Sequence, residues 1–164
     1  MASLPPFLRT LLVTDGTVTK SLEAYFWEPV AVENLGQEVV PLARDTPWLG
    51  LERGAEVLHR RVRLVGGHSG TVYAHAESRI RLTRLPADLR DELRQGRIGI
   101  GELLRECGLE TYRELLDFGV GPVQGLAHVF TVPDETLVHR TYRIAVGHQP
   151  AILITEHFPL SVYR

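Results

Sequence analysis

Residues 151–158 form an almost wholly apolar run that contains a single acid, Glu156. A β-rich stretch, residues 141–146, precedes this run, and the short gap between them includes Gly147 and Pro150. Glycine and proline in such a gap predict a β-hairpin. A strand this apolar belongs in the middle of a sheet, where both of its faces are covered. A carboxylate there must pair with a cation, take up a proton or serve a ligand, so Glu156 is a candidate functional residue; a structural ion pair is the alternative.

The composition indicates one compact domain that spans residues 1–164. Of the 164 residues 44% are hydrophobic, which is enough for a substantial core. The formal charge of -2 argues against nucleic acid as a partner. The one cysteine, Cys107, excludes an internal disulfide and a cysteine-based zinc site. Neither a secretory signal nor an apolar run of the ~20 residues that span a membrane is visible, so we expect a cytoplasmic protein without a membrane partner. The sequence leaves monomer and dimer open.

Alternating and helical patterns along the rest of the chain predict an α+β domain. Residues 58–65 and 71–82 read as strands on either side of a glycine-rich turn and form a second hairpin. Because the strands pair locally and helices lie before and between them, we expect a single antiparallel sheet of about six strands with helices packed on one face. Helices are predicted over residues 4–13, 17–26, 85–95, 99–107 and, from apolar spacing, 110–118; strands over 27–35 and 126–132; an irregular connection over 38–54; and a turn at 133–135.

Arg60 lies on the apolar side of its predicted strand. The alternation over residues 58–65 puts Arg60 on the same face as leucine and valine side chains, with Arg61 and Arg63 on the other face. A guanidinium on a core-facing side is unusual unless it meets a carboxylate. It is therefore a candidate for binding an anionic ligand, and the alternatives are an internal ion pair or a side chain that reaches out to solvent at the strand end. Arg61 and Arg63 are predicted to be solvated.

The other ionisable residues give weaker signals. Glu77 is a second acid within a predicted strand, and Gly99 and Gly101 open a predicted helix whose first N–H groups are able to accept a carboxylate. No histidine pair has the spacing of a metal site, and no phosphate-binding loop, dinucleotide fingerprint or nucleophile elbow occurs. We therefore expect no metal site. The seven histidines are His59, His68, His75, His128, His139, His148 and His157.

Four segments, in order along most of the chain, resemble the chorismate pyruvate-lyase (4-hydroxybenzoate synthase) family. Residues 11–20 are similar to its leucine-rich helix and the acid-Ser-hydrophobe-Thr-Lys segment that follows. Residues 60–64 are similar to its Arg-Glu-Ile-Leu-Leu strand, and residues 98–104 to its Pro-Leu-Gly helix start. Residues 152–159 are similar to its Leu-Leu-Thr-Glu-Leu-Phe ending. The resemblance implies the chorismate lyase-like fold.

The resemblance also implies an activity. Enzymes of this family remove the enolpyruvyl group of chorismate, giving pyruvate and 4-hydroxybenzoate, without metal or cofactor. By resemblance, Arg60 holds the ring carboxylate and Glu156 receives the hydroxyl at the other end of the ring. Backbone N–H groups at Val18 and Ile100 assist Arg60, and residues 17–20 and 96–104 act as flaps that exclude water. Arg61, as a fallback for Arg60, Glu77 and Thr155 complete the candidate substrate-binding set.

Departures from the family pattern leave the substrate and the product isomer open. Glu77-Ser78 stands where the best-known branch has Arg-Thr, and residues 121–135 form a longer linker. The product is then 4-hydroxybenzoate or its 3-hydroxy isomer. A second hypothesis is a non-catalytic, UTRA-like domain that senses a small acid in transcription regulators, although no DNA-binding winged helix is expected before Leu4. A third is an enzyme repurposed for another aromatic or polyketide-like acid.

Overall fold

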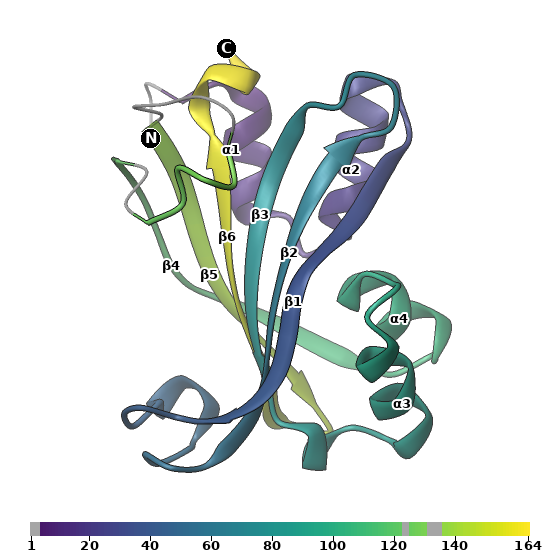
Figure 1. Ribbon diagram of the computed structural model, residues 1–164, viewed down its shortest axis with the longest axis vertical. Coiled ribbons are helices and arrows are strands. Elements are labelled where there is room, and N and C mark those ends of the chain that lie inside the picture. The colour runs from purple at the N-terminus through teal and green to yellow at the C-terminus, as the bar shows by residue number, and fades with distance from the viewer. Residues whose placement is uncertain (1–3, 123–124, 131–135) are drawn as a thin grey trace.

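The computed structural model describes residues 4–122, 125–130 and 136–164, and it consists of one antiparallel sheet with helices (Figure 1). The sheet has six strands in the order β1-β2-β3-β6-β5-β4. This architecture confirms the predicted α+β class. The strands are β1 Val30–Pro41, β2 Glu56–Gly66, β3 Val72–Ile80, β4 Thr111–Pro122, β5 Thr136–Val146 and β6 Gln149–Pro159.

Two pairs of helices lie at different ends of the sheet (Figure 1). None of the helices in the described ranges is long and apolar enough to cross a membrane. The helices are α1 Pro6–Val13, α2 Val18–Phe26, α3 Ala87–Gln95 and α4 Ile100–Glu106; short 3-10 turns occur at Pro47–Leu49, Leu82–Arg84 and Leu160–Tyr163.

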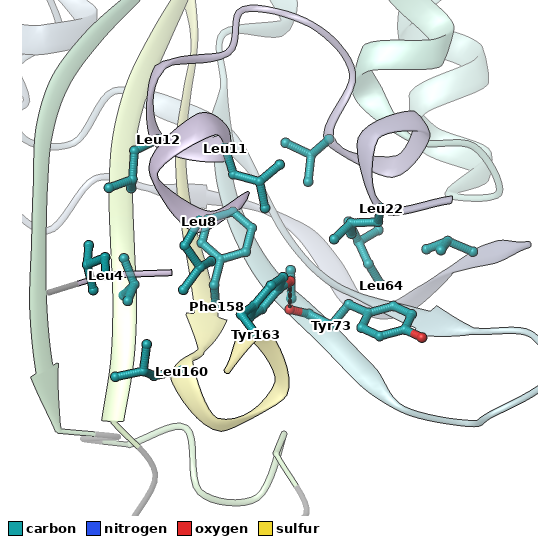
Figure 2. Packing of buried hydrophobic residues seen from close by; sticks show 14 residues of the cluster. Leu4, Leu8, Leu11, Leu12, Leu22, Leu64, Tyr73, Phe158, Leu160 and Tyr163 are labelled. Atoms are coloured by element: carbon teal, nitrogen blue, oxygen red, sulfur yellow. Dashed lines mark hydrogen bonds between the residues drawn. The ribbon is translucent and has the colours of Figure 1, made fainter. Parts of the chain in front are cut away.

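The first hydrophobic cluster joins α1 and α2 to one end of the sheet. Proline is tolerated in the first turn of α1, where an N–H would lack a partner in any case. Leu8 and Leu11 of α1 and Leu22 of α2 are fully buried against Leu64 of β2 and Phe158 of β6 (Figure 2). Burying each leucine contributes about 1.5–3 kcal/mol relative to leaving it in water.

The second cluster joins α3 and α4 to the other end of the same face. Leu89 and Leu93 of α3, four residues apart and so on one side of the helix, pack with Leu103 of α4. Ile144 and Ile152 supply the sheet side of this cluster, and both are fully buried. Between the two clusters the sheet carries polar side chains on the same face.

Strand register sorts the predicted site residues between the two faces of the sheet. Arg60 pairs with Ser78, and Ser78 pairs with Ile154, so these residues share one face. Side chains alternate along a strand, so their neighbours Arg61 and Glu77 belong to the opposite face. That opposite face carries four of the seven histidines, His59, His75, His139 and His157, and none of the α-helices in the described ranges covers it.

The closing hairpin is confirmed, with a tighter turn than predicted. Gly147 and His148 form the two-residue turn and have φ angles of 56° and 61°. Positive φ at both positions is what a type I′ turn requires, and this turn matches the twist of the flanking strands. Gln149 and Pro150 therefore belong to β6 instead of the loop.

The helix predicted over residues 110–118 is wrong, because this segment is the edge strand β4. A β-bulge between Leu115 and Asp117 inserts one extra residue. The helix was predicted from the spacing of Tyr112, Leu115 and Leu116, but in the strand Tyr112 and Leu115 lie on opposite faces. Full-length pairing with β5 decides the conformation.

Smaller corrections concern the loops. β1 continues to Pro41, so the irregular connection starts later than predicted. Residues 126–130 form turns instead of a strand, and the rest of that prediction, with the turn at 133–135, lies outside the described residues. Thr17 stands at the N-cap of α2, but its side chain makes no capping hydrogen bond.

Candidate active site

A pocket lies on the helix-covered face, between the two hydrophobic clusters. Its floor is the sheet, and its roof is formed by residues 16–19, which lead into α2, and residues 99–102, which lead into α4. The pocket holds about 640 Å³ of empty space, part of it open to solvent. The polar side chains of the floor are Arg60, Ser78, Arg113, Tyr142 and Glu156.

Arg60 is a buried cation that lacks an acidic partner within the described residues. It is 2% exposed, and its Nη2 donates to the carbonyl oxygen of Ile98 at 2.6 Å. Its Nε and Nη1 have no hydrogen-bond partner in the described ranges. Burial lowers the pKa of Arg60, but an arginine stays protonated at neutral pH. A buried charge with two unused donors beside a pocket is matched by an anionic ligand, above all by a carboxylate.

Glu156 also lines the pocket, and its ion-pair partner is Arg140, one strand away. The Glu156 side chain is almost fully buried, with the residue 6% exposed. Nε of Arg140 donates to Oε2 at 2.6 Å, and the hydroxyl of Tyr142 donates to Oε1 at 3.0 Å. Arg140 also donates through Nη1 to the carbonyl oxygens of Leu11 and Thr14 at the end of α1. The carboxylate is thus fixed in place from both oxygens.

Electrostatics within this cluster favour a charged Arg140 and a neutral Tyr142. Burial opposes the charge of Arg140, but the interactions with Glu156 and Tyr142 together outweigh burial, so the pKa of Arg140 is raised. Burial, together with the negative charge of Glu156, raises the pKa of Tyr142. Tyr142 therefore stays protonated and donates its hydrogen bond to Glu156.

The roof segments place two helix starts at the pocket. Val18 is the first residue of α2 and Ile100 the first residue of α4, and both residues line the pocket. The first N–H groups of a helix have no partner within the helix. No capping side chain occupies these groups, since neither Thr17 nor Gly99 makes a side-chain cap.

The structure brings together four of the predicted site residues: Arg60, Glu156, Val18 and Ile100. The other three, Arg61, Glu77 and Thr155, do not line this pocket, because strand alternation turns them to the opposite face. Arg61 is exposed there.

Glu77 and Thr155, the other two predicted site residues on the opposite face, form hydrogen bonds there. Glu77 accepts from His59 and Arg79 at 2.9 and 3.0 Å. Thr155 shares a hydrogen bond of 2.9 Å with Thr141. Glu77 therefore adds no negative charge to the pocket, and Ser78 is the β3 residue in its floor.

Two residues that line the pocket, Arg113 and Tyr142, were not predicted from the sequence, nor was Arg140, the ion-pair partner of Glu156. The parity of β5 was a usable signal, because Arg140 and Tyr142 lie on the same face of the strand as Val138 and Ile144, which are both fully buried. Arg113 gave no such signal, since its strand had been predicted as a helix. Among the described residues no group of three or more histidine, cysteine or acidic side chains is placed to hold a metal ion.

Fold and pocket together give a helix-covered antiparallel sheet with a buried arginine, unpaired among the described residues, and a fixed carboxylate in one cavity. Comparison with known proteins gives the family. Residues 12–164 match the chorismate pyruvate-lyase Rv2949c-like family. The chorismate pyruvate-lyase of Mycobacterium tuberculosis (strain CDC 1551 / Oshkosh) is 33% identical over 162 residues, which cover 96% of this chain and 81% of the relative. That of Mycobacterium leprae is 31% identical over 159 residues, covering 96% and 76%. The chain belongs to this family of carbon–oxygen lyases.

Solved structures with the same fold include the effector domain of PhnF from Mycobacterium smegmatis. The TM-score is 0.70, the sequence identity is 12%, and the match covers 90% of each chain. At that identity the likeness shows the shared fold alone. The resemblance of the fold to effector-sensing domains is therefore confirmed, together with membership of the lyase family.

Proposed function

We propose that this chain is a chorismate pyruvate-lyase that binds chorismate between Arg60 and Glu156 and releases pyruvate and 4-hydroxybenzoate. One observation carries the proposal: a guanidinium that is 2% exposed has two donors without a partner among the described residues and lies in the same pocket as a fixed carboxylate. Membership of the lyase family supplies the reaction class.

In the proposed complex the ring carboxylate of chorismate binds Arg60. The two unused donors, Nε and Nη1, suit a carboxylate with two acceptor oxygens. N–H groups at Val18 and Ile100, on the two roof segments, add further donors to the same anion. The ring hydroxyl then points towards Glu156, which is ready to accept its hydrogen bond.

Because the ring becomes aromatic, the protein mainly has to orient chorismate and to stabilise the charge that develops on the leaving group. The C4–H proton of chorismate is lost, the C3–O bond of the enolpyruvyl ether breaks, and the ring becomes aromatic. The electron pair leaves with enolpyruvate, which takes up a proton on carbon and becomes pyruvate. Donors fixed before the reaction stabilise the charge as it moves to the leaving oxygen. Roof segments 16–19 and 99–102 keep water away from the ring.

The test is turnover by the purified chain. Chorismate is added, pyruvate is followed through a coupled lactate dehydrogenase, and the aromatic product is identified by chromatography against 4- and 3-hydroxybenzoate. We expect pyruvate and 4-hydroxybenzoate in equal amounts, well above the spontaneous rate. Release at the spontaneous rate would rule the proposal out, and the 3-hydroxy isomer would change the product.

A second candidate is a sensor of a small acid, favoured by the fold shared with the PhnF effector domain. The same pocket would then bind its acid without converting it. Tight binding of chorismate or 4-hydroxybenzoate in titration calorimetry, with no pyruvate released, would support this candidate. Turnover of a different aromatic or polyketide-like acid would indicate a repurposed enzyme.

A further inference from the structure

We propose that Arg113 binds the second carboxylate of the substrate, the one that leaves with pyruvate, and thereby distinguishes substrate from product. This inference rests on the proposed function, because it takes chorismate as the substrate. It adds a specificity-determining residue on the edge strand β4, at the side of the pocket away from Arg60.

Two arginines line the pocket from strands on either side of its floor, both on the helix-covered face of the sheet. Arg60 comes from β2 and Arg113 from β4, and strands β3, β6 and β5 lie between them. Glu156 of β6 and Tyr142 of β5 occupy the floor between the two guanidinium groups. A ligand that spans the floor therefore meets a cation at each end and the fixed carboxylate in the middle.

Arg113 has donors to spare. Its Nη1 donates to the carbonyl oxygens of Asp15 and Gly16, in the segment that enters the pocket roof; the second of these bonds measures 2.7 Å. In the described part of the chain its Nε and Nη2 make no hydrogen bond, and no acid lies within ion-pair distance. The guanidinium is partly exposed, and its partners are neutral carbonyl groups, so no ion pair among the described residues offsets its charge. A ligand carboxylate would supply both the acceptors and the countercharge.

The guanidinium lies where the two roof segments meet. A Cβ atom added at Gly101 would be 3.4 Å from Nη2 of Arg113 and 3.5 Å from Thr17, so the missing side chain keeps this junction open. The charge of Arg113 also acts on Tyr142, which lines the pocket. Burial raises the pKa of Tyr142, and the positive charge of Arg113 acts in the opposite direction.

The number of carboxylates separates substrate from product. Chorismate carries one carboxylate on the ring and one on the enolpyruvyl group, and both are joined in one molecule that is held at two ends. Breaking the C3–O bond divides the two anions between 4-hydroxybenzoate and pyruvate. Each product then has one arginine only, and loses the advantage of being held at both ends. Two cations on opposite sides thus favour binding of the substrate over retention of the product.

The experiment compares Arg113→Gln with Arg143→Gln, which removes the same charge from the opposite face. Arg143 bonds to Glu114 and to the carbonyl oxygen of Trp48, and it does not line the pocket. KM and kcat are measured with chorismate, and the inhibition constant is measured with 4-hydroxybenzoate. For Arg113→Gln we expect KM to rise about 10- to 100-fold, as for the loss of a charge-assisted contact. The inhibition constant should change less than about twofold. Arg143→Gln should change neither constant.

An equal rise in both constants would overturn the inference, because Arg113 would then only hold residues 15–16 in place. Unchanged constants would overturn it too. Arg113→Lys keeps the charge without the paired donors, and we expect its KM to lie between those of the wild type and Arg113→Gln. Turnover by the wild type is scored separately, and an inactive wild type refutes the proposed function. If the wild type is active but Arg113→Gln does not raise KM more than the inhibition constant, only the role of Arg113 is refuted.

Discussion

At the scale of single residues, the unpaired charge of Arg60 separates binding from stability. A buried cation without an acid partner costs free energy in the empty protein, and an anionic ligand offsets that cost. The side chain is therefore expected to strengthen ligand binding and to lower the free energy of unfolding of the empty protein. Arg60→Met fills the same space without the charge.

We predict that Arg60→Met weakens binding of 4-hydroxybenzoate by about 2–5 kcal/mol, the range for removing one partner of a buried charge pair. The free energy of unfolding should stay equal or rise, because a hydrophobic isostere replaces an unpaired charge. Titration calorimetry and urea denaturation measure the two quantities. Arg61→Met is the matched control, at an exposed position on the opposite face, and should leave both unchanged. Normal binding by Arg60→Met would remove Arg60 from the site.

Glu156 presents the opposite situation, since its charge is already paired within the fold. Replacing it with glutamine leaves Arg140 buried without a countercharge, at a cost of about 3–5 kcal/mol. We predict that Glu156→Gln lowers both turnover and the free energy of unfolding. The double variant Glu156→Gln/Arg140→Met should regain most of the stability but none of the turnover. Urea denaturation and the pyruvate assay separate these outcomes. If turnover returned with stability, Glu156 would be a structural residue.

At the scale of elements, alternation and turn chemistry were readable from the sequence, and bulges were not. The strand with Arg60, the four helices and both hairpins were predicted from apolar spacing and from Gly and Pro positions. A two-residue turn at Gly147-His148 alone would place His139 opposite Glu156. A bulge between Ile144 and Ala145 shifts the register by one and brings Arg140 there instead. No residue type marks that bulge, so the partner of Glu156 could not be identified.

The wrong assignment of β4 had a larger effect on the prediction of the site. The spacing of Tyr112, Leu115 and Leu116 favoured a helix, so the position of Arg113 relative to the pocket could not be predicted. The lack of an acidic partner for Arg60 could not be predicted from the sequence either. A sequence shows that an arginine lies on an apolar face, but it does not show which acid it lacks. Long-range pairing between strands decides both questions.

At the scale of the whole molecule, the two faces of the sheet differ in kind. The covered face holds the pocket, and the other carries a row of three imidazoles on neighbouring strands, since His157 pairs with His75 on one side and with His139 on the other. The ring centroids are 5.9 and 6.2 Å apart. The Nδ1 atoms of His75 and His157 are buried and have no hydrogen-bond partner among the described residues. Protonating such rings in the folded state is unfavourable.

Acid should therefore destabilise the fold at a pH above the usual range for carboxylates. Burial, with the charge of His157, lowers the pKa of His75 to about 4, and burial, with His139, lowers that of His157. An unfolded histidine takes up its proton near pH 6.5. Between pH 6.5 and 4 the unfolded chain binds more protons than the folded chain, so the free energy of unfolding falls as the pH is lowered. Hydrogen bonds from Tyr73 and Ser69 hold the pKa of Glu28 at about 2, so the contribution of that carboxylate is lost only below pH 4.5.

We predict a loss of roughly 1–3 kcal/mol in the free energy of unfolding between pH 7 and pH 4.5 from this pair of histidines. Urea denaturation across that range measures it. His75→Gln removes one proton-binding site, so its stability should fall less steeply with acid than that of the wild type. His68→Gln, in the exposed β2–β3 turn, is the matched control and should retain the wild-type slope. Parallel slopes for all three proteins would show that His75 is protonated as readily in the fold as in the unfolded chain, and the row of imidazoles would then have no part in the acid sensitivity of the molecule.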